Sequence, residues 1–364
     1  MQNNSPRGGA DVVVDDVVKN AGSWLSAGRA DGIAISSRIR LARNLKNMAF
    51  PDWAGEDESA KVFARIGDAF KKSGVLAQPL IIDINKLALI DREILKERHL
   101  ISAELSEGGP GVGLILSEAD RVAIMVNEED HMRMQVIVPG KDLHSAWEKL
   151  NSVDTSLERL LDYSFSLTLG YLTACPSNVG TGLRASVMMH LPALKLMSEA
   201  DQVVKGLDRI GFAVRGLLGE GTDAHGSMFQ VSNQITLGDA EEHIIRKLDE
   251  IVDEIVQHEK NARARLMEDE RPCLFDEVGR AFGVLMNARI LPSKEALDLL
   301  SSLWLGVECG LVRNLTVSRI NELMLLTQPG HLQKMLKKVL ESEERDEVRA
   351  RIVRQKLKNV ILAI

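Results

Sequence analysis

The pattern of hydrophobic and polar positions changes near residue 239 of the 364-residue chain. Before it, short segments that are apolar throughout or alternate apolar with polar residues lie between segments with an apolar position every three or four residues. After it, the helical spacing continues to the end. This order predicts an α+β protein, in which an antiparallel sheet flanked by helices is followed by an all-helical C-terminal domain.

Three expected strands follow one another with short connections, at 112–116, 122–126 and 132–138, and predict an antiparallel meander. Further strands are expected at 33–44, from 184 onward, at 212–216 and at 228–232. The helical spacing predicts helices at 57–73, 87–99, 143–169 (as one helix or a broken pair) and 192–207.

The domain boundaries follow from the same pattern. Residues 1–30 predict a loosely held N-terminal extension, residues 31–268 form the domain that contains the sheet, and residues 269–364 form the helical domain. The leucine-rich helix faces of the last domain suit packing between subunits, so a homodimer is expected. Its helices are expected near 276–288, 294–309, 318–327, 331–341 and 343–359.

Composition narrows the class of protein. Hydrophobic residues make up 45% of the chain, enough for a sizeable core, and no window resembles a membrane span or a signal peptide, so a cytoplasmic protein is expected. The net charge of −7 argues against direct binding of nucleic acid, which requires a concentrated basic face. The three cysteines are far apart and predict neither a disulfide framework nor a zinc site.

Arginines stand at strand positions where solvent or an anion must face them. In the strand 33–44, Ile35, Ser37, Ile39 and Leu41 fall on one side, and Ser36, Arg38 and Arg40 on the other. A solvated strand face explains this spacing, and so does an anion held between the two guanidinium groups. Other arginines next to strands or glycine turns are Arg43, Arg133, Arg184 and Arg215. Together these arginines predict a clamp for a polyphosphate, in a chain without a Walker loop, kinase HRD or DFG triplet, or dinucleotide glycine fingerprint.

Two carboxylates and a thiol lie near these arginines in the sequence. Glu129 belongs to the acidic turn before Arg133, and Glu220 belongs to a glycine-rich turn after Arg215. A surface turn explains either carboxylate, but a pair of them also suits a cationic nucleophile, which they hold and deprotonate. Cys175 opens the loop that leads to Arg184, either as a third negative group or as a small packed residue.

The motifs 175–184 (CPSNVGTGLR) and 36–43 (SSRIRLAR), with Ser232-Asn233, resemble the phosphagen (guanidino) kinase family. The segments 127–131 (NEEDH), 184–192 (RASVMMHLP), 215–221 and 230–238 are most similar to its protein-arginine kinase branch, whose members phosphorylate arginine side chains in proteins. The resemblance runs from about residue 33 to the end. Small-molecule guanidino kinases carry a helical domain before the SxRxR strand, whereas this chain carries its helical domain at the C-terminus.

The resemblance implies a kinase that uses ATP and Mg²⁺, with Glu129 and Glu220 as the carboxylates that hold and deprotonate arginine and Cys175 as an assisting thiol. It assigns no residue of the chain as a metal ligand. It implies ATP contacts from Ser36, Ser37, Arg38, Ile39, Arg40, His99, Arg133, Arg184, Ala185, Ser186, Val187, Met188, Arg215, Gly216, Leu217, Leu218, Gly219 and Glu220.

The C-terminal segment Arg345-Asp346-Glu347-Val348-Arg349-Ala350 matches the RDxxRA motif of that branch, which implies allosteric binding of phosphoarginine through Arg345, Asp346, Arg349 and Ala350. Charged residues at this spacing also occur on any exposed helix. As partners, the resemblance implies protein substrates with exposed arginine, a zinc-binding activator protein and a Clp-type unfoldase and protease, with substrates marked for degradation or a stress repressor inactivated. Alternatives are a kinase for free arginine or a similar small guanidine, and a phosphoarginine-binding regulator without strong catalysis.

Overall fold

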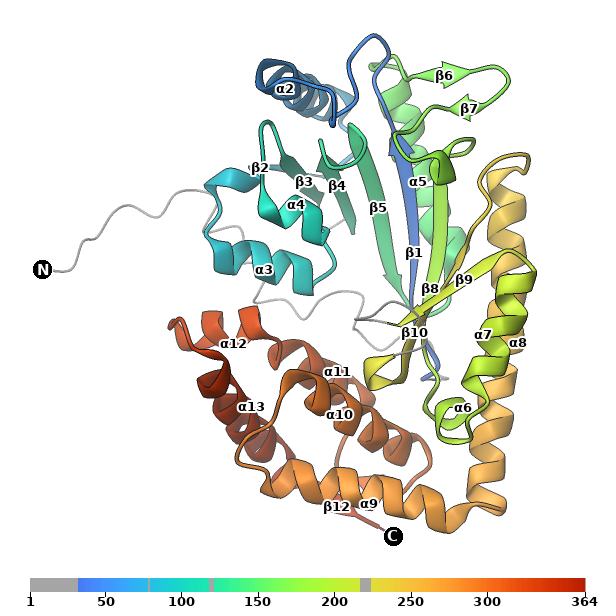
Figure 1. Ribbon diagram of the computed structural model, residues 1–364, viewed down its shortest axis with the longest axis vertical. Helices are drawn as coiled ribbons and strands as arrows, with labels where there is room; N and C mark the ends of the chain where they lie inside the picture. The colour runs from blue at the N-terminus through green and yellow to red at the C-terminus, as the bar shows by residue number, and fades with distance from the viewer. Residues whose placement is uncertain (1–31, 78, 118–120, 217–223, 364) are drawn as a thin grey trace, which may run out of the picture.

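The structure is a computed structural model that describes residues 32–77, 79–117, 121–216 and 224–363. An eight-stranded sheet forms its centre, in the order β2-β3-β4-β5-β1-β8-β10-β9, and every neighbouring pair of strands is antiparallel (Figure 1). The predicted α+β fold with an antiparallel sheet and a helical C-terminal region is therefore confirmed. The strands are β1 (Ala34–Arg43), β2 (Leu80–Asp83), β3 (Gly113–Ser117), β4 (Val122–Val126), β5 (Met132–Pro139), β8 (Leu183–His190), β9 (Phe212–Gly216) and β10 (Met228–Asn233).

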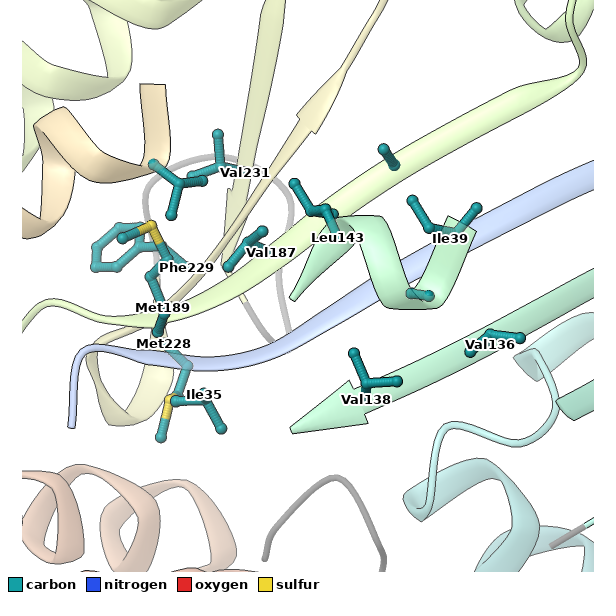
Figure 2. Close-up of a cluster of buried hydrophobic side chains, with 14 of the residues drawn as sticks. Ile35, Ile39, Val136, Val138, Leu143, Val187, Met189, Met228, Phe229 and Val231 are labelled. Atoms are coloured by element: carbon teal, nitrogen blue, oxygen red, sulfur yellow. The ribbon is translucent and has the colours of Figure 1, made fainter. Parts of the chain in front are cut away.

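The first face of the sheet is covered by long helices. α5 (Leu143–Glu158) packs on β1 and β5, and α8 (Glu241–Glu268) packs on β8 and β10, while α2 (Glu56–Ser73) packs beside α5. Apolar side chains of alternate strand positions fill this layer, as Figure 2 shows for Ile39, Val136, Val187 and Val231. The period-two pattern of these strands therefore builds the main core.

The second face divides into two halves. Over β3 and β4, a smaller apolar cluster packs against α3 (Leu89–Glu97) and α4 (Ala103–Glu107), with Leu114 and Met125 below Ile94 and Leu105. Over β1, β5, β8 and β9, the same face carries arginines, and β10 adds Gln230. The change from an apolar to a basic surface within one sheet face marks the region where a ligand is expected.

The C-terminal domain faces this basic half of the sheet (Figure 1). Its helices are α9 (Arg271–Asn287), α10 (Ser293–Glu308), α11 (Val317–Leu326), α12 (Pro329–Leu336) and α13 (Ser342–Leu357). A short pair of strands, β11 (Val312–Arg313) and β12 (Ile361–Leu362), joins them, so the expectation of helices alone is wrong in this detail. None of the helices in the described part of the chain is long and apolar enough to cross a membrane.

Two predicted helices end earlier than expected. The helix from 143 ends at Glu158, and residues up to 171 form the hairpin of β6 (Phe165–Ser166) and β7 (Gly170–Tyr171). There the Ser166 hydroxyl accepts the backbone N–H groups of Thr168 and Leu169, which closes a turn that competes with helix. The helix from 192 divides into α6 (Pro192–Leu196) and α7 (Ala200–Arg209), because Ser198 adopts a left-handed conformation with φ 58°.

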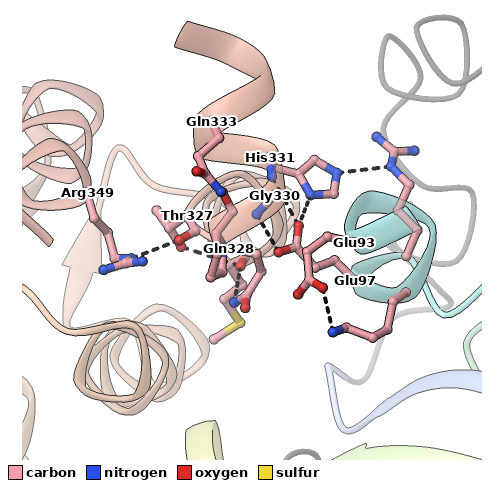
Figure 3. Close-up of polar contacts among 12 residues, drawn as sticks. Glu93, Glu97, Thr327, Gln328, Gly330, His331, Gln333 and Arg349 are labelled. Carbon is pink, nitrogen blue, oxygen red and sulfur yellow. Dashed lines mark hydrogen bonds and ion pairs between the residues drawn. The ribbon is translucent and has the colours of Figure 1, made fainter. Parts of the chain in front are cut away.

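Helix α3 of the sheet domain is bound to the N-terminus of α12 (Figure 3). The Glu97 carboxylate accepts the backbone N–H groups of Gly330 at 2.6 Å and His331 at 3.1 Å, and it accepts Nδ1 of His331 at 2.6 Å. Nε2 of His331 accepts the Nε–H of Arg98 at 3.1 Å, which assigns the ring proton to Nδ1. A side chain of the first domain thus caps a helix of the second and fixes the spacing between them.

Candidate active site

Strand register brings the arginines of four strands to one surface. Arg40 on β1 lies directly opposite Arg184 on β8 and opposite Gln135 on β5, and Arg38 lies opposite Ser186. Residues two apart share a face, so Arg133 joins this row from β5. On β10, Gln230 lies opposite Arg215 of β9 and accepts a hydrogen bond of 2.6 Å from Arg38 Nη2. The arginine cluster is defined here as Arg38, Arg40, Arg133, Arg184 and Arg215.

The arginine cluster carries more positive charge than the described residues around it neutralise. Burial, and then the charges of Arg133 and Arg184, lower the pKa of Arg38 to about 10. Burial, and then the charges of Arg38, Arg133 and Arg184, lower the pKa of Arg40 well below its usual value. The buried Nε atoms of Arg40 and Arg184 have no hydrogen-bond partner among the described residues. Unpaired buried donors on mutually repelling cations are what an anionic ligand satisfies.

The cluster lies in a cleft of about 860 Å³ between the sheet and two other walls. One wall is the segment from α3 to α4, with His99 and Ser102, and the other is the C-terminal domain, with Leu297, Asn321 and Met324. The floor is the sheet itself, including Ser36, Ser186, Met188, Gly216 and Gln230. The volume and the mixture of apolar side chains with a few polar groups suit a ligand of nucleotide size.

His99 enters the cleft from an unusual backbone conformation. Its φ is 57°, the left-handed region, and it follows the C-cap residue of α3. The N–H groups of His99 and Leu100 donate to the carbonyls of Lys96 and Leu95, which is the Schellman pattern at a position usually taken by glycine. Burial, and then the charge of Arg38, lower the pKa of His99 to about 4, so the ring is neutral at pH 7. A non-glycine residue held in this conformation is typical of a binding site.

An acidic turn lies beyond Arg133, between β4 and β5. Glu128 accepts two hydrogen bonds of 2.7 Å from Arg133 Nη1, one at each carboxylate oxygen. Asp130 is buried and has a structural role, since its Oδ1 accepts Asn44 Nδ2 and the N–H of Ala174. Glu129 is exposed, and partial burial together with the charge of Asp130 raises the pKa of its carboxyl. The turn therefore presents Glu129 to a ligand, while its neighbours are paired with the protein.

Cys175 lies against this turn. Its thiol is near enough to the Glu129 carboxylate to oppose the rise of its pKa, lies 3.0 Å from the Ser177 hydroxyl and interacts electrostatically with Arg184. The thiol is half-buried and is not packed in the core, so the interpretation of Cys175 as a small packed residue loses its basis. Glu129 and Cys175 are thus brought together at the end of the arginine cluster.

Arg43 does not belong to the arginine cluster, contrary to the sequence-based expectation. Arg43 lies two and four residues after Leu41 and Ile39, so its side chain points to the same face of the sheet as theirs. That face is the core, and Arg43 is 1% exposed there. There Nε and Nη2 donate to Asp154, at 3.1 and 2.7 Å, and the guanidinium lies 3.5 Å from the ring centre of Tyr171. A buried carboxylate and an aromatic ring neutralise this arginine, so no ligand is required.

Four predicted nucleotide contacts also point away from the cleft. Ser37, Ile39, Ala185 and Val187 are buried on the opposite face, where the Ser37 hydroxyl donates to the carbonyl of Gly140. Only their backbone lies near the cleft. Predicted residues Leu217, Leu218, Gly219 and Glu220 lie outside the described residues, as does the extension 1–30. Sequence reasoning missed Glu128, Gln135 and Gln230. Gln135 has the strand parity of Arg133 and lies opposite Arg40, whereas Glu128 lies in the turn before β5 and has no strand parity to follow.

The RDxxRA segment lies on α13, which packs against α9 and α12. Arg349 is 1% exposed and donates to the carbonyls of Thr327 and Leu291, each at 2.8 Å, and to Asp346 at 2.5 Å. Ala350 is buried, whereas Arg345 is half-buried and donates to the carbonyl of Leu340. Arg349 is therefore largely occupied by protein contacts, and Arg345 is the more accessible of the two arginines.

Comparison with known proteins agrees with this geometry. Residues 61–262 match the family described as "ATP:guanido phosphotransferase, C-terminal catalytic domain", and residues 271–361 match "Protein-arginine kinase McsB C-terminal domain". Among solved structures, a taurocyamine kinase from Schistosoma mansoni aligns with a TM-score of 0.58 at 23% identity, covering 69% of this chain and 38% of that one. A lombricine kinase aligns with a TM-score of 0.56 at 24% identity, covering 72% and 74%. These two structures support the fold of the sheet domain.

Full-length relatives extend the comparison to the C-terminal domain. The chain is 47% identical over 338 residues to the protein-arginine kinase of Moorella thermoacetica, covering 92% of this chain and 97% of that one. It is 41% identical over 344 residues to the protein-arginine kinase of Halothermothrix orenii, covering 94% and 98%. Since both the catalytic and the C-terminal regions match over almost their whole length, the chain belongs to the protein-arginine kinase family of ATP:guanido phosphotransferases.

Proposed function

We propose that the cleft is the site at which this protein-arginine kinase transfers the γ-phosphoryl group of ATP to an arginine side chain of a protein substrate. The observation that carries the proposal is the arginine cluster, whose unpaired Nε atoms line a nucleotide-sized cleft that leads to Glu129 and Cys175. Arg38, Arg40 and Arg184 neutralise the triphosphate, and Arg133 bridges the cluster and the acidic turn.

The acidic turn orients the acceptor. Glu129 accepts hydrogen bonds from the substrate guanidinium and places one of its nitrogens in line with the γ-phosphorus. As the N–P bond forms and the bond from the γ-phosphorus to the bridging oxygen breaks, ADP leaves with that oxygen and Glu129 takes a proton from the attacking nitrogen. The raised pKa of Glu129 suits a group that receives a proton. Glu220 and Cys175 assist by holding the guanidinium from other sides.

Bound together with the nucleotide, Mg²⁺ would supply neutralisation of the phosphate charge. Glu128 and Glu129 are the carboxylates of the described residues that adjoin the arginine cluster. No group of three or more ligating His, Cys, Asp or Glu side chains occurs in the described ranges, which fits an ion held mainly by substrate phosphates.

A phosphotransfer assay tests the proposal. The parent protein is expected to place acid-labile phosphate on a protein such as casein, whereas Glu129→Gln is expected to lose about 100-fold or more in rate, the usual range for a general base. Label on free L-arginine and none on protein would instead favour a small guanidine as substrate. Label on neither substrate, with phosphoarginine binding intact, would favour the non-catalytic regulator.

The remaining expectations from the resemblance are proposed as well. Arg345, Asp346, Arg349 and Ala350 bind phosphoarginine for allosteric control, with Arg345 as the accessible phosphate partner. The protein works in the cytoplasm with a zinc-binding activator, and it marks substrates for a Clp-type protease or inactivates a stress repressor. Exposed apolar side chains of the C-terminal domain, such as Met335 and Val339, support a homodimer, which sedimentation analysis tests.

A further inference from the structure

The wall that the C-terminal domain contributes to the cleft contains one unsatisfied polar side chain. Asn321 lines the cleft from α11 and is 4% exposed, and its Oδ1 is buried with no hydrogen-bond partner in the described part of the chain. Nearby polar side chains differ, since Thr327 and Gln328 donate to the carbonyls of Leu323 and Met324. A buried amide without a partner costs free energy unless a ligand completes it.

The direction of the site along β1 indicates which part of the nucleotide reaches Asn321. The acceptor carboxylate Glu129 adjoins Arg133, whose strand neighbour on β1 is Ala42, near the end of that strand. Ser36, at the other end of β1, is about 13 Å from Arg40 along the strand. The γ-phosphate must lie at the acceptor end, so the ribose and base extend toward Ser36.

The cleft changes character at this far end. Its floor there is mostly apolar, with Ile35, Ile137, Met188 and Met228, and the opposing wall presents Met324 and Leu325 of α11 beside Asn321. A flat heteroaromatic ring fits between two apolar surfaces, and methionine sulfur makes favourable contacts with aromatic rings. The Asn321 amide, at the edge of the space between these two surfaces, is placed to hydrogen-bond the polar edge of a base.

We infer that Asn321 and the adjoining face of α11 bind the adenine base of ATP, so that the C-terminal domain supplies half of the nucleotide site. This inference rests on the proposed function of the cleft. The asparagine amide has one donor and one acceptor group, which match the N1 acceptor and the 6-amino donor of adenine. Rotation about χ2, a broad torsion, turns either amide atom toward the cleft. Asn321 is therefore a specificity-determining residue carried by a domain outside the sheet.

The experiment compares two ligands and two proteins. The dissociation constants of ATP and of purine riboside triphosphate, which lacks the 6-amino group, are measured by calorimetry for the parent protein and for Asn321→Leu. In the parent, loss of the amino group is expected to weaken binding about tenfold. In Asn321→Leu, ATP is expected to bind about tenfold more weakly, and the two ligands are expected to bind equally. Asn287→Ala, an exposed asparagine on α9, is the matched control and leaves both constants unchanged.

Further results separate this inference from the proposed function. If the parent protein binds both ligands equally, or if Asn321→Leu still distinguishes them tenfold, the assignment of Asn321 is wrong. The ligand comparison in the parent protein gives this answer even if a variant fails to fold. Arg38→Met is expected to lose nucleotide binding whatever Asn321 does. If Arg38→Met binds ATP as the parent does, the cleft is not the nucleotide site and the proposed function fails.

Discussion

Arg40 and Arg184 lie directly opposite each other on the antiparallel strands β1 and β8. Like charges in this position destabilise a sheet by a few tenths to about 1 kcal/mol, and each of these side chains also buries an unpaired Nε. The protein without ligand therefore carries an electrostatic cost, which a polyphosphate removes.

Replacement of Arg40 by methionine tests this cost. Arg40→Met is expected to raise the free energy of unfolding of the ligand-free protein by up to about 1 kcal/mol, because it removes the repulsion. ATP at 100 times its dissociation constant is expected to stabilise the parent protein by about 2.7 kcal/mol and Arg40→Met much less. Thermal unfolding with and without ATP measures both effects. Arg65→Met, on the exposed face of α2, is the control, and equal stabilisation of Arg40→Met and the parent by ATP would contradict the assignment.

Arg43 is expected to behave in the opposite way. Arg43→Met leaves Asp154 as a buried charge without its arginine and is expected to cost about 3–5 kcal/mol of unfolding free energy. The double variant Arg43→Met with Asp154→Leu is expected to recover much of this loss, since neither charge remains. Denaturant unfolding gives the values. A large loss of ATP affinity in a folded Arg43 variant would show that the residue contacts the nucleotide after all.

The pH dependence of the reaction is expected to report the acidic turn. In the proposed role Glu129 acts when ionised, and its pKa is raised, so the rate is expected to fall with decreasing pH at values above the ordinary glutamate pKa of 4.5. Glu128 contributes to this increase, so Glu128→Gln is expected to move the acidic limb of the kcat/KM profile to lower pH. Profiles of the parent and the variant, both normalised to their plateaus, make the comparison. An unchanged or higher limb in Glu128→Gln would exclude Glu129 as the titrating group.

Glu97 is expected to control the docking of the C-terminal domain. Glu97→Ala removes the acceptor of two backbone N–H groups and of His331 Nδ1 at the start of α12, which costs about 1–2 kcal/mol for a helix cap. Amide hydrogen exchange in α12 is expected to increase locally, while β1 and β8 keep their protection. Glu104→Ala, on the exposed surface of α4, is the control. Unchanged exchange in α12 would mean that other contacts hold the two domains together.

The sequence predicted the fold, and it also predicted which face of β1 carries Arg38 and Arg40, because both depend on local patterns. Period-two alternation placed Arg38 and Arg40 opposite the core, and the same rule applied to Arg43 predicts its burial. The pairing of Arg40 with Arg184 and Gln135 depends on strand register, which joins distant segments and has no local signal. Glu128 and Glu129 are neighbours, and the sequence does not show which of the two carboxylates turns to Arg133; in the structure it is Glu128. Asn321 lines the cleft because the C-terminal domain packs against the sheet domain, and no sequence motif predicts that arrangement.

The left-handed backbone of His99 gives the site a trade-off between stability and activity at one residue. A non-glycine residue in this conformation costs about 1–2 kcal/mol, which glycine partly avoids. His99→Gly is therefore expected to yield a protein that resists heat better and binds nucleotide less well, because the relief of backbone strain and the loss of the ring occur together. Selection of variants for thermal tolerance alone would favour glycine at position 99, whereas selection for turnover would keep the strained histidine.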